Sequence, residues 1–192
     1  MPPPGAAPAM QCLFFDVRPK PGHMDAYFAH VDRLRPILAR HRGLIYLERF
    51  RPLDDPEALL SHQFWADEAA ITAWRRDIAH RASQWAGQRL HFESYRIRVG
   101  PQAVHSPEGA ARWLVAAYGP APAAIGRGYE SVTRPGRFVT LAEASGGAAA
   151  QALAEGMAPG ADEIRVFAIT RDYTMTDRAE APGYCPVSGR SR

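Results

Sequence analysis

Residues 64–100 read FWADEAAITAWRRDIAHRASQWAGQRLHFESYRIRVG, and this stretch divides into a helix and a strand. Asp67 is a typical helix N-cap, and Gly87 is a typical helix end. The apolar residues between them recur at the spacing of one helix face: Ile71, Trp74, Ile78, Ala82 and Trp85. The stretch therefore predicts a helix between Asp67 and Gly87, followed by a strand over 90–99.

The residues before this stretch supply the rest of an α+β unit. Residues 12–17 (CLFFDV) predict a strand that ends in a Pro- and Gly-containing loop, and the apolar spacing over 23–42 predicts a helix. Two further strands, 44–50 and 58–65, flank the turn sequence PLDDP (52–56) and form a hairpin. The order β-α-β-β-α-β over 12–100 is that of a ferredoxin-like unit, with two helices on one face of a sheet.

The second half of the chain predicts a degenerate copy of the same unit. Strands are expected over 112–118, 129–133, 138–142 and 163–173, with a short helix over 148–157. The segment between Tyr118 and Tyr129 is too short and too broken for a first helix. We therefore divide the chain into an irregular N-terminus (1–11), a first domain (12–100), a linker (101–110), a degenerate second domain (111–175) and an irregular tail (176–192).

The composition argues against several classes of partner. Lys and Arg number 23 against 20 Asp and Glu, and this excess is scattered, so nucleic-acid binding is not expected. No window of eighteen apolar residues exists, and the first residues lack the features of an export signal. We therefore expect a cytoplasmic protein without membrane contact, in which Cys12 and Cys185 stay reduced.

Residues 12–100 resemble the antibiotic biosynthesis monooxygenase family, whose members form a dimeric α+β barrel. The resemblance is carried by W-x-D-E-x-A-x-x-x-W (65–74), by H-R-x-x-Q-x-x-G (80–87) and by the aromatic strand that follows. It implies an oxygenase that acts on a small aromatic molecule. Such enzymes include oxygenases of phenols, quinols and anthrones that use no cofactor, and also haem-degrading enzymes. Nothing functional is carried by the resemblance onto the second half.

The haem-degrading branch is matched only in part. Its site has an Asn on the first strand, a Trp on the second helix and a His about ten residues after that Trp. Trp74 stands at the Trp position, but His80 follows it by only six residues, and Asp16 stands where the Asn is expected. Haem therefore remains the alternative to a site without cofactor.

His80 and Asp16 are the candidate catalytic bases. An imidazole is the usual base near neutral pH, but on a continuous helix His80 does not share the stripe of Trp74 and Ile78, so a solvated or Asp77-paired histidine is the alternative. Asp16 shares one strand face with apolar residues, where a carboxylate is partly desolvated unless it is paired. His62, in the middle of a strand, is expected to be a hydrogen-bonded core residue.

Four aromatic residues are candidate walls of a substrate pocket: Trp74, Trp65, Tyr95 and Phe14. For Trp74 and its stripe, plain core packing is the alternative. No nucleotide-binding, zinc or serine-hydrolase motif occurs in the sequence.

The sequence therefore predicts a cofactor-independent monooxygenase of a small phenolic, quinol or polyketide-type metabolite. The alternatives are a haem-degrading enzyme and a non-catalytic binding or stress module, and a cavity of several hundred cubic ångströms favours an enzyme. Because the outer sheet faces carry apolar residues, we expect the two halves to pair within one chain, while association of two chains through other surfaces stays open.

Overall fold

The computed structural model describes residues 10–103 and 112–183. The first unit holds four strands, three α-helices and a π-helical turn, in the order β1 (Gln11–Pro19), α1 (Met24–Leu38), β2 (Leu44–Pro52), β3 (Leu59–Trp65), α2 (Glu68–Arg76), α3 (Ile78–Ala86), η1 (Gly87–His91) and β4 (Phe92–Pro101). The α+β class and the ferredoxin-like order of this unit are confirmed.

The second unit repeats the strand pattern with a single helix among its described residues. Its elements are β5 (Trp113–Gly119), β6 (Arg127–Ser131), β7 (Phe138–Ala144), α4 (Gly147–Met157), β8 (Glu163–Ala168) and β9 (Arg171–Thr174). The connection from β5 to β6 holds no helix, as its length predicts. The expected single strand over 163–173 is two strands, because the chain leaves β5 after Ala168 and pairs with β4 from Arg171.

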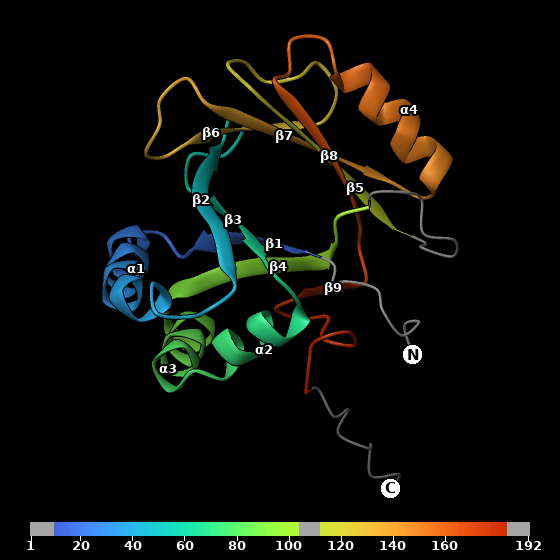
Figure 1. The fold of residues 1–192 in the computed structure, drawn as a ribbon. Coiled ribbons are helices and arrows are strands. Elements are labelled where there is room, and N and C mark those ends of the chain that lie inside the picture. The colour runs from blue at the N-terminus through green and yellow to red at the C-terminus, as the bar shows by residue number, and fades with distance from the viewer. Residues whose placement is uncertain (1–9, 104–111, 184–192) are drawn as a thin grey trace, which may run out of the picture.

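The strands of both units form one antiparallel sheet with the order β8-β5-β7-β6-β2-β3-β1-β4-β9. The units join where β2 pairs with β6 over three residue pairs, from Phe50 opposite Ser131 to Pro52 opposite Tyr129. The units meet again where Gln102, after β4, forms a bridge with Phe167 of β8, the strand at one end of the sheet order. The sheet therefore curls into a barrel, and Figure 1 shows the helices on its outer surface.

The inside of the barrel is filled mainly by side chains from both units. Because neighbouring strand residues face opposite sides, each strand contributes every second residue to the interior. These buried residues are Cys12, Phe14, Phe50, Leu60, Phe64, Leu114, Ala116, Tyr118, Tyr129, Val139, Leu141, Phe167 and Ile169. The alternate residues pack beneath the outer helices, for example Val99 with Trp65, and Val115 with Ala150.

The predicted helix between Asp67 and Gly87 is wrong as a single element, because it breaks at Asp77. Asp77 leaves the helical conformation with ψ 133°, and its carboxylate accepts hydrogen bonds from the backbone N–H groups of Ala79 and His80, which begin α3. This local cap competes with the continuous helix. As a result Ile78 and Trp85 are 86% and 60% exposed, although the spacing places them in the core.

The last predicted strand of the first unit begins two residues later than expected. Residues 87–91 form the π-helical turn η1, and β4 starts at Phe92. Gly87 lies against the Phe92 ring so closely that an added Cβ would sit 2.4 Å from it. The absence of a side chain at Gly87 thus permits the tight packing of this turn.

The described residues cover the predicted domain boundaries only in part. Residues 1–9, 104–111 and 184–192, with Cys185, lie outside them. Within the expected linker, Ala103 donates its N–H to Val166 of β8 at 2.9 Å. In the expected tail, Glu180 forms an ion pair with Arg112. None of the described helices is long and apolar enough to cross a membrane.

Candidate active site

Two cavities share one cluster of charged side chains in their linings. The larger has a volume of about 570 Å³ and the smaller of about 410 Å³. Both are lined by Arg96, Arg98 and Glu143. The arginines belong to β4 of the first unit and Glu143 to β7 of the second, so the cluster spans the two units.

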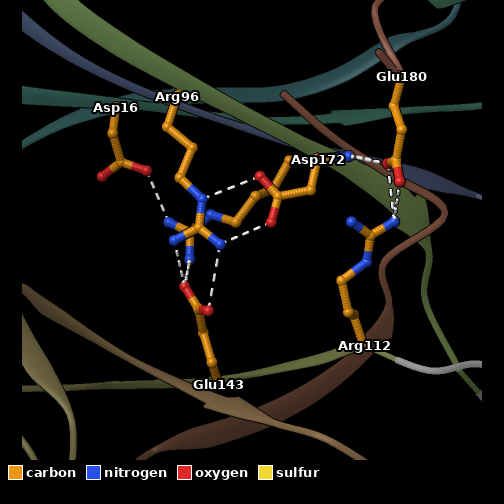
Figure 2. Close-up of polar contacts among 7 residues, drawn as sticks. Asp16, Arg96, Arg112, Glu143, Asp172 and Glu180 are labelled. Atoms are coloured by element: carbon orange, nitrogen blue, oxygen red, sulfur yellow. Dashed lines mark hydrogen bonds and ion pairs between the residues drawn. The ribbon is translucent and has the colours of Figure 1, made fainter. Parts of the chain in front are cut away.

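The strand registers bring the charged residues to the inner face. In the pairing of β1 with β4, Phe14 lies opposite Arg98 and Asp16 opposite Arg96, so these side chains point to the interior with Phe14. In the pairing of β4 with β9, Asp172 lies opposite Arg98. Figure 2 shows the resulting network of contacts.

Glu143 is held by both arginines at once. Its Oε1 accepts hydrogen bonds from Arg96 Nη1 at 2.7 Å and from Arg98 Nη1 at 2.8 Å, and its Oε2 accepts from Arg96 Nη2 at 3.2 Å. The Glu143 side chain is 52% exposed, whereas that of Arg98 is 6% exposed. A partly solvated carboxylate, that of Glu143, is therefore paired with the buried guanidinium of Arg98.

The other carboxylates of the cluster are more buried. Asp16 Oδ2 accepts a hydrogen bond from Arg98 Nη2 at 2.6 Å, and Asp172 accepts two from Arg96 at 2.6 and 2.9 Å. Hydrogen bonding to Asp172 raises the pKa of Arg96 despite partial burial. Burial disfavours the ionised form of Asp172, but the Arg96 contact outweighs burial and lowers the Asp172 pKa. Both groups are thus charged near neutral pH.

Asp16 also accepts a hydrogen bond from a tyrosine that lines the larger cavity. Tyr129 of β6 donates its hydroxyl to Asp16 Oδ1 at 3.2 Å. Burial, followed by the nearby Asp16 charge, raises the pKa of Tyr129 to about 12, so this side chain is a hydrogen-bond donor at neutral pH. Asp16, Arg98 and Tyr129 together place a carboxylate between two donors at the cavity wall.

Two of the six predicted site residues line this larger cavity, Asp16 and Tyr95. The Tyr95 hydroxyl accepts a hydrogen bond from Gln88 at 2.7 Å and another from Arg178. Tyr95 therefore links β4 to the turn η1 and to the residues after β9.

Phe14 and Trp65 line neither cavity. Phe14 is fully buried in the barrel core, where it stacks on His62 with ring centroids 4.3 Å apart. Trp65 is fully buried beneath α1 and α2, and its Nε1–H donates to Gln63 at 2.9 Å. The structure gives both side chains a packing role, because their strands alternate between the core and the helix layer.

His80 and Trp74 lie together in the outer helix layer, away from both cavities. The break at Asp77 turns the His80 ring onto the Trp74 indole, at a centroid distance of 4.0 Å. His80 Nδ1 lies 3.0 Å from the Trp74 carbonyl oxygen, so this nitrogen carries the proton. Burial lowers the pKa of His80 to about 4. Asp77 pairs with His41 through its side chain.

His62 is the hydrogen-bonded core histidine that its strand position predicts. It is fully buried, and its Nε2 lies 2.6 Å from the Tyr118 hydroxyl. Burial lowers its pKa to about 3, which keeps the ring neutral. Its place is inside the aromatic core rather than at a cavity.

Sequence reasoning missed most of the polar residues that line the cavities, above all Arg96, Arg98, Glu143 and Tyr129. One signal was available, because Arg96 and Arg98 alternate with apolar residues along a strand whose inner face must be buried. Nothing comparable marks Glu143, which reaches the arginines from the second unit.

The two cavity linings lack two of the common axial ligands of haem iron. They include no histidine and no cysteine among the described residues, so no imidazole or thiolate faces either cavity. The described residues also contain no group of three or more His, Cys, Asp or Glu side chains that could hold a metal ion.

Comparison with known proteins identifies a matching family model and a relative along most of the chain. A family model described as antibiotic biosynthesis monooxygenase matches residues 10–85. A protein of Pyricularia oryzae named jasmonate monooxygenase ABM is 30% identical over an alignment 218 residues long. The alignment covers 92% of this chain and 99% of that protein.

Solved structures resemble the chain at lower identity. A protein from Shewanella oneidensis is 20% identical over 47% of this chain and 88% of its own, with a TM-score of 0.44. A protein from Pseudomonas aeruginosa is 14% identical over 52% of this chain and all of its own, with a TM-score of 0.46. On the strength of the family model and the full-length relative, the resemblance seen in the sequence is confirmed: the chain belongs to the antibiotic biosynthesis monooxygenase family.

Proposed function

We propose that the chain is a cofactor-independent monooxygenase whose substrate lies in the larger cavity, with Asp16 as the base. The observation that carries this proposal is the Asp16 carboxylate, held between Arg98 and Tyr129 at the wall of a cavity of about 570 Å³. A cavity of this size suits a small organic substrate, and it favours an enzyme over a binding module without a cavity. Family membership supports the oxygenase class.

The chemistry requires a substrate that supplies its own electrons, as phenols, quinols and anthrones do. Asp16 removes an acidic proton from the substrate, and the resulting anion transfers electrons to molecular oxygen. For an activated methylene group, two C–H bonds break and one C=O bond forms. One oxygen atom stays in the product, and the other leaves as water with the two hydrogens. The donors Arg98 and Tyr129 stabilise negative charge beside the reacting carbon.

Asp16 is favoured over His80 as the base because of their positions. Asp16 lines the cavity, whereas His80 is stacked on Trp74 in the helix layer and its Nδ1 is engaged by a backbone carbonyl. A base must reach the proton that it removes, directly or through one water.

Oxygen uptake tests the proposal directly. The wild-type protein is assayed against a panel of phenols, quinols and anthrones, with jasmonate included because the relative's name contains it. We expect uptake above the buffer blank with at least one compound, and a loss of about 10²-fold in Asp16→Asn. The matched control is Asp32→Asn, which removes an exposed carboxylate on α1. Uptake at the blank rate across the panel, or full activity in Asp16→Asn, overturns the proposal.

A further inference from the structure

We propose that Arg96 and Arg98 bind the carboxylate of an anionic substrate, and that Glu143 occupies this site while the cavity holds no ligand. The inference deepens the proposed function, on which it rests, by naming the chemical class of the substrate as an organic monocarboxylate. It follows from the contacts of Glu143, from its exposure and from the two cavities that it lines.

The two arginines already present carboxylate-binding geometry. Arg96 engages both oxygens of Glu143 through Nη1 and Nη2, at 2.7 and 3.2 Å, and Arg98 adds a third hydrogen bond at 2.8 Å. This fork of parallel N–H donors is specific for a planar carboxylate. A ligand carboxylate at the same place would make the same contacts.

Glu143 is the exchangeable member of the cluster. Its side chain is 52% exposed, whereas those of Asp16 and Asp172 are 20% and 14% exposed. Glu143 gains little from these ion pairs because its own carboxylate is largely solvated, so it competes weakly with a ligand. When Glu143 moves into water and a ligand carboxylate replaces it, the charge beside the arginines is unchanged.

Arg98 provides the fixed part of the site. Its side chain is buried, and its Nε has no hydrogen-bond partner among the described residues. Arg98 Nη1 donates to Glu143, so a ligand carboxylate that replaces Glu143 keeps this hydrogen bond, whereas an empty site loses it. Asp16 holds Arg98 from the other side at 2.6 Å and fixes its orientation.

The exchange would also join the two cavities, because Glu143 and both arginines line each of them. Leu59 and Leu141 supply apolar wall in the larger cavity, and Trp113 and Ile169 do so in the smaller. The arrangement therefore suits a molecule with one carboxylate and an apolar body, placed with the body toward Asp16.

Binding titrations test this without turnover. Calorimetry measures the affinity of jasmonate and benzoate, and of their neutral methyl esters, for the wild-type protein and for Glu143→Gln. Removal of the internal competitor should tighten the binding of at least one carboxylate about fivefold or more and leave its ester unchanged. Arg96→Gln should weaken the binding of the same carboxylate. Glu163→Gln is the matched control, since Glu163 forms an ion pair of similar exposure outside both cavities.

Three outcomes would overturn the inference: no carboxylate binds to Glu143→Gln, the affinity is unchanged or weaker, or acid and ester gain equally. The last would mean that the substitution merely opens the cavity. A thermal melt of each variant checks the fold, and Glu143→Asp, whose shorter side chain loses the fork, should reproduce the gain. Carboxylate tightening without oxygen uptake would contradict the proposed function and keep this inference. Oxygen uptake without tighter carboxylate binding in Glu143→Gln would support the proposed function and contradict this inference.

Discussion

Ser131 of the second unit donates its hydroxyl to Glu48 of the first unit at 2.5 Å, and both residues are buried. Arg134 and Arg137 bring further donors to the same carboxylate, again from the second unit. Burial disfavours ionised Glu48, but these hydrogen bonds outweigh burial and lower its pKa. The junction of β2 with β6 thus has a buried carboxylate whose partners come mainly from the other unit.

Glu48→Gln should lower the free energy of unfolding by about 3 kcal/mol, because two arginines and the buried Ser131 hydroxyl then face a neutral amide. Urea denaturation at neutral pH measures the loss. Glu57→Gln, at an exposed carboxylate in the loop before β3, should stay within about 0.5 kcal/mol of wild type. Equal stability of the two variants would show that the junction does not depend on this carboxylate.

Gly100→Ala should destabilise the contact between the units at the opposite edge. A Cβ at Gly100 would lie 1.9 Å from the carbonyl oxygen of Ala168, so the backbone of β4 or of the chain after β8 must move. We expect a loss of about 3 kcal/mol in unfolding free energy, measured by thermal and urea denaturation. Gly146→Ala, where a Cβ meets nothing within 4 Å, is the control. A neutral Gly100→Ala would mean that the edges are not in contact in solution.

Ile71→Ala and Ile78→Ala should differ sharply in their effect on the free energy of unfolding, although both isoleucines lie on the same predicted apolar stripe. Ile71 is on the buried face of α2, so its truncation should cost about 2–4 kcal/mol. Ile78 is largely exposed, so its truncation should change stability by less than about 0.5 kcal/mol. Chemical denaturation of the pair measures the difference, and similar losses would argue that α2 and α3 form one continuous helix after all.

The free energy of unfolding should fall as the pH is lowered from about 6.5 toward 4. In the unfolded chain both His62 and His80 take up protons near pH 6.5. In the folded protein burial lowers their pKa values to about 3 and about 4, so the native state binds these protons only at lower pH. At these pH values the unfolded state binds more protons than the native state, so the free energy of unfolding falls as the pH is lowered.

His62 alone should account for about 2 kcal/mol of this loss between pH 7 and pH 5. Urea titrations at the two pH values measure the dependence in the wild-type protein and in His62→Gln. The variant should lose part of the pH dependence even if it is less stable at both values. An unchanged pH dependence in His62→Gln would show that this imidazole titrates alike in both states.

The element order could be predicted from the sequence because local patterns determine it. Alternation of apolar residues marks the strands, and the missing helix between Tyr118 and Tyr129 follows from chain length alone. The break at Asp77 escaped prediction because an aspartate inside a helical pattern can either face solvent or cap a new helix. The pattern of apolar residues contains no information on which of the two occurs.

The candidate site was predictable only on the side of the first unit. Asp16 and Tyr95 lie in strands whose residues the sequence could assign. Glu143 lies 45 residues from Arg98 along the chain, and only the pairing of the two units brings them into contact. A contact of this kind depends on tertiary structure and leaves no periodic signal in either segment.

The fusion of two units in one chain frees the barrel from symmetry. In a ring of two identical chains every side chain occurs twice, and so does every site. In this chain Asp16, Arg96 and Arg98 come from the first unit and Glu143 from the second. Each half can therefore change independently of the other. The expected stoichiometry is a single ligand for each polypeptide.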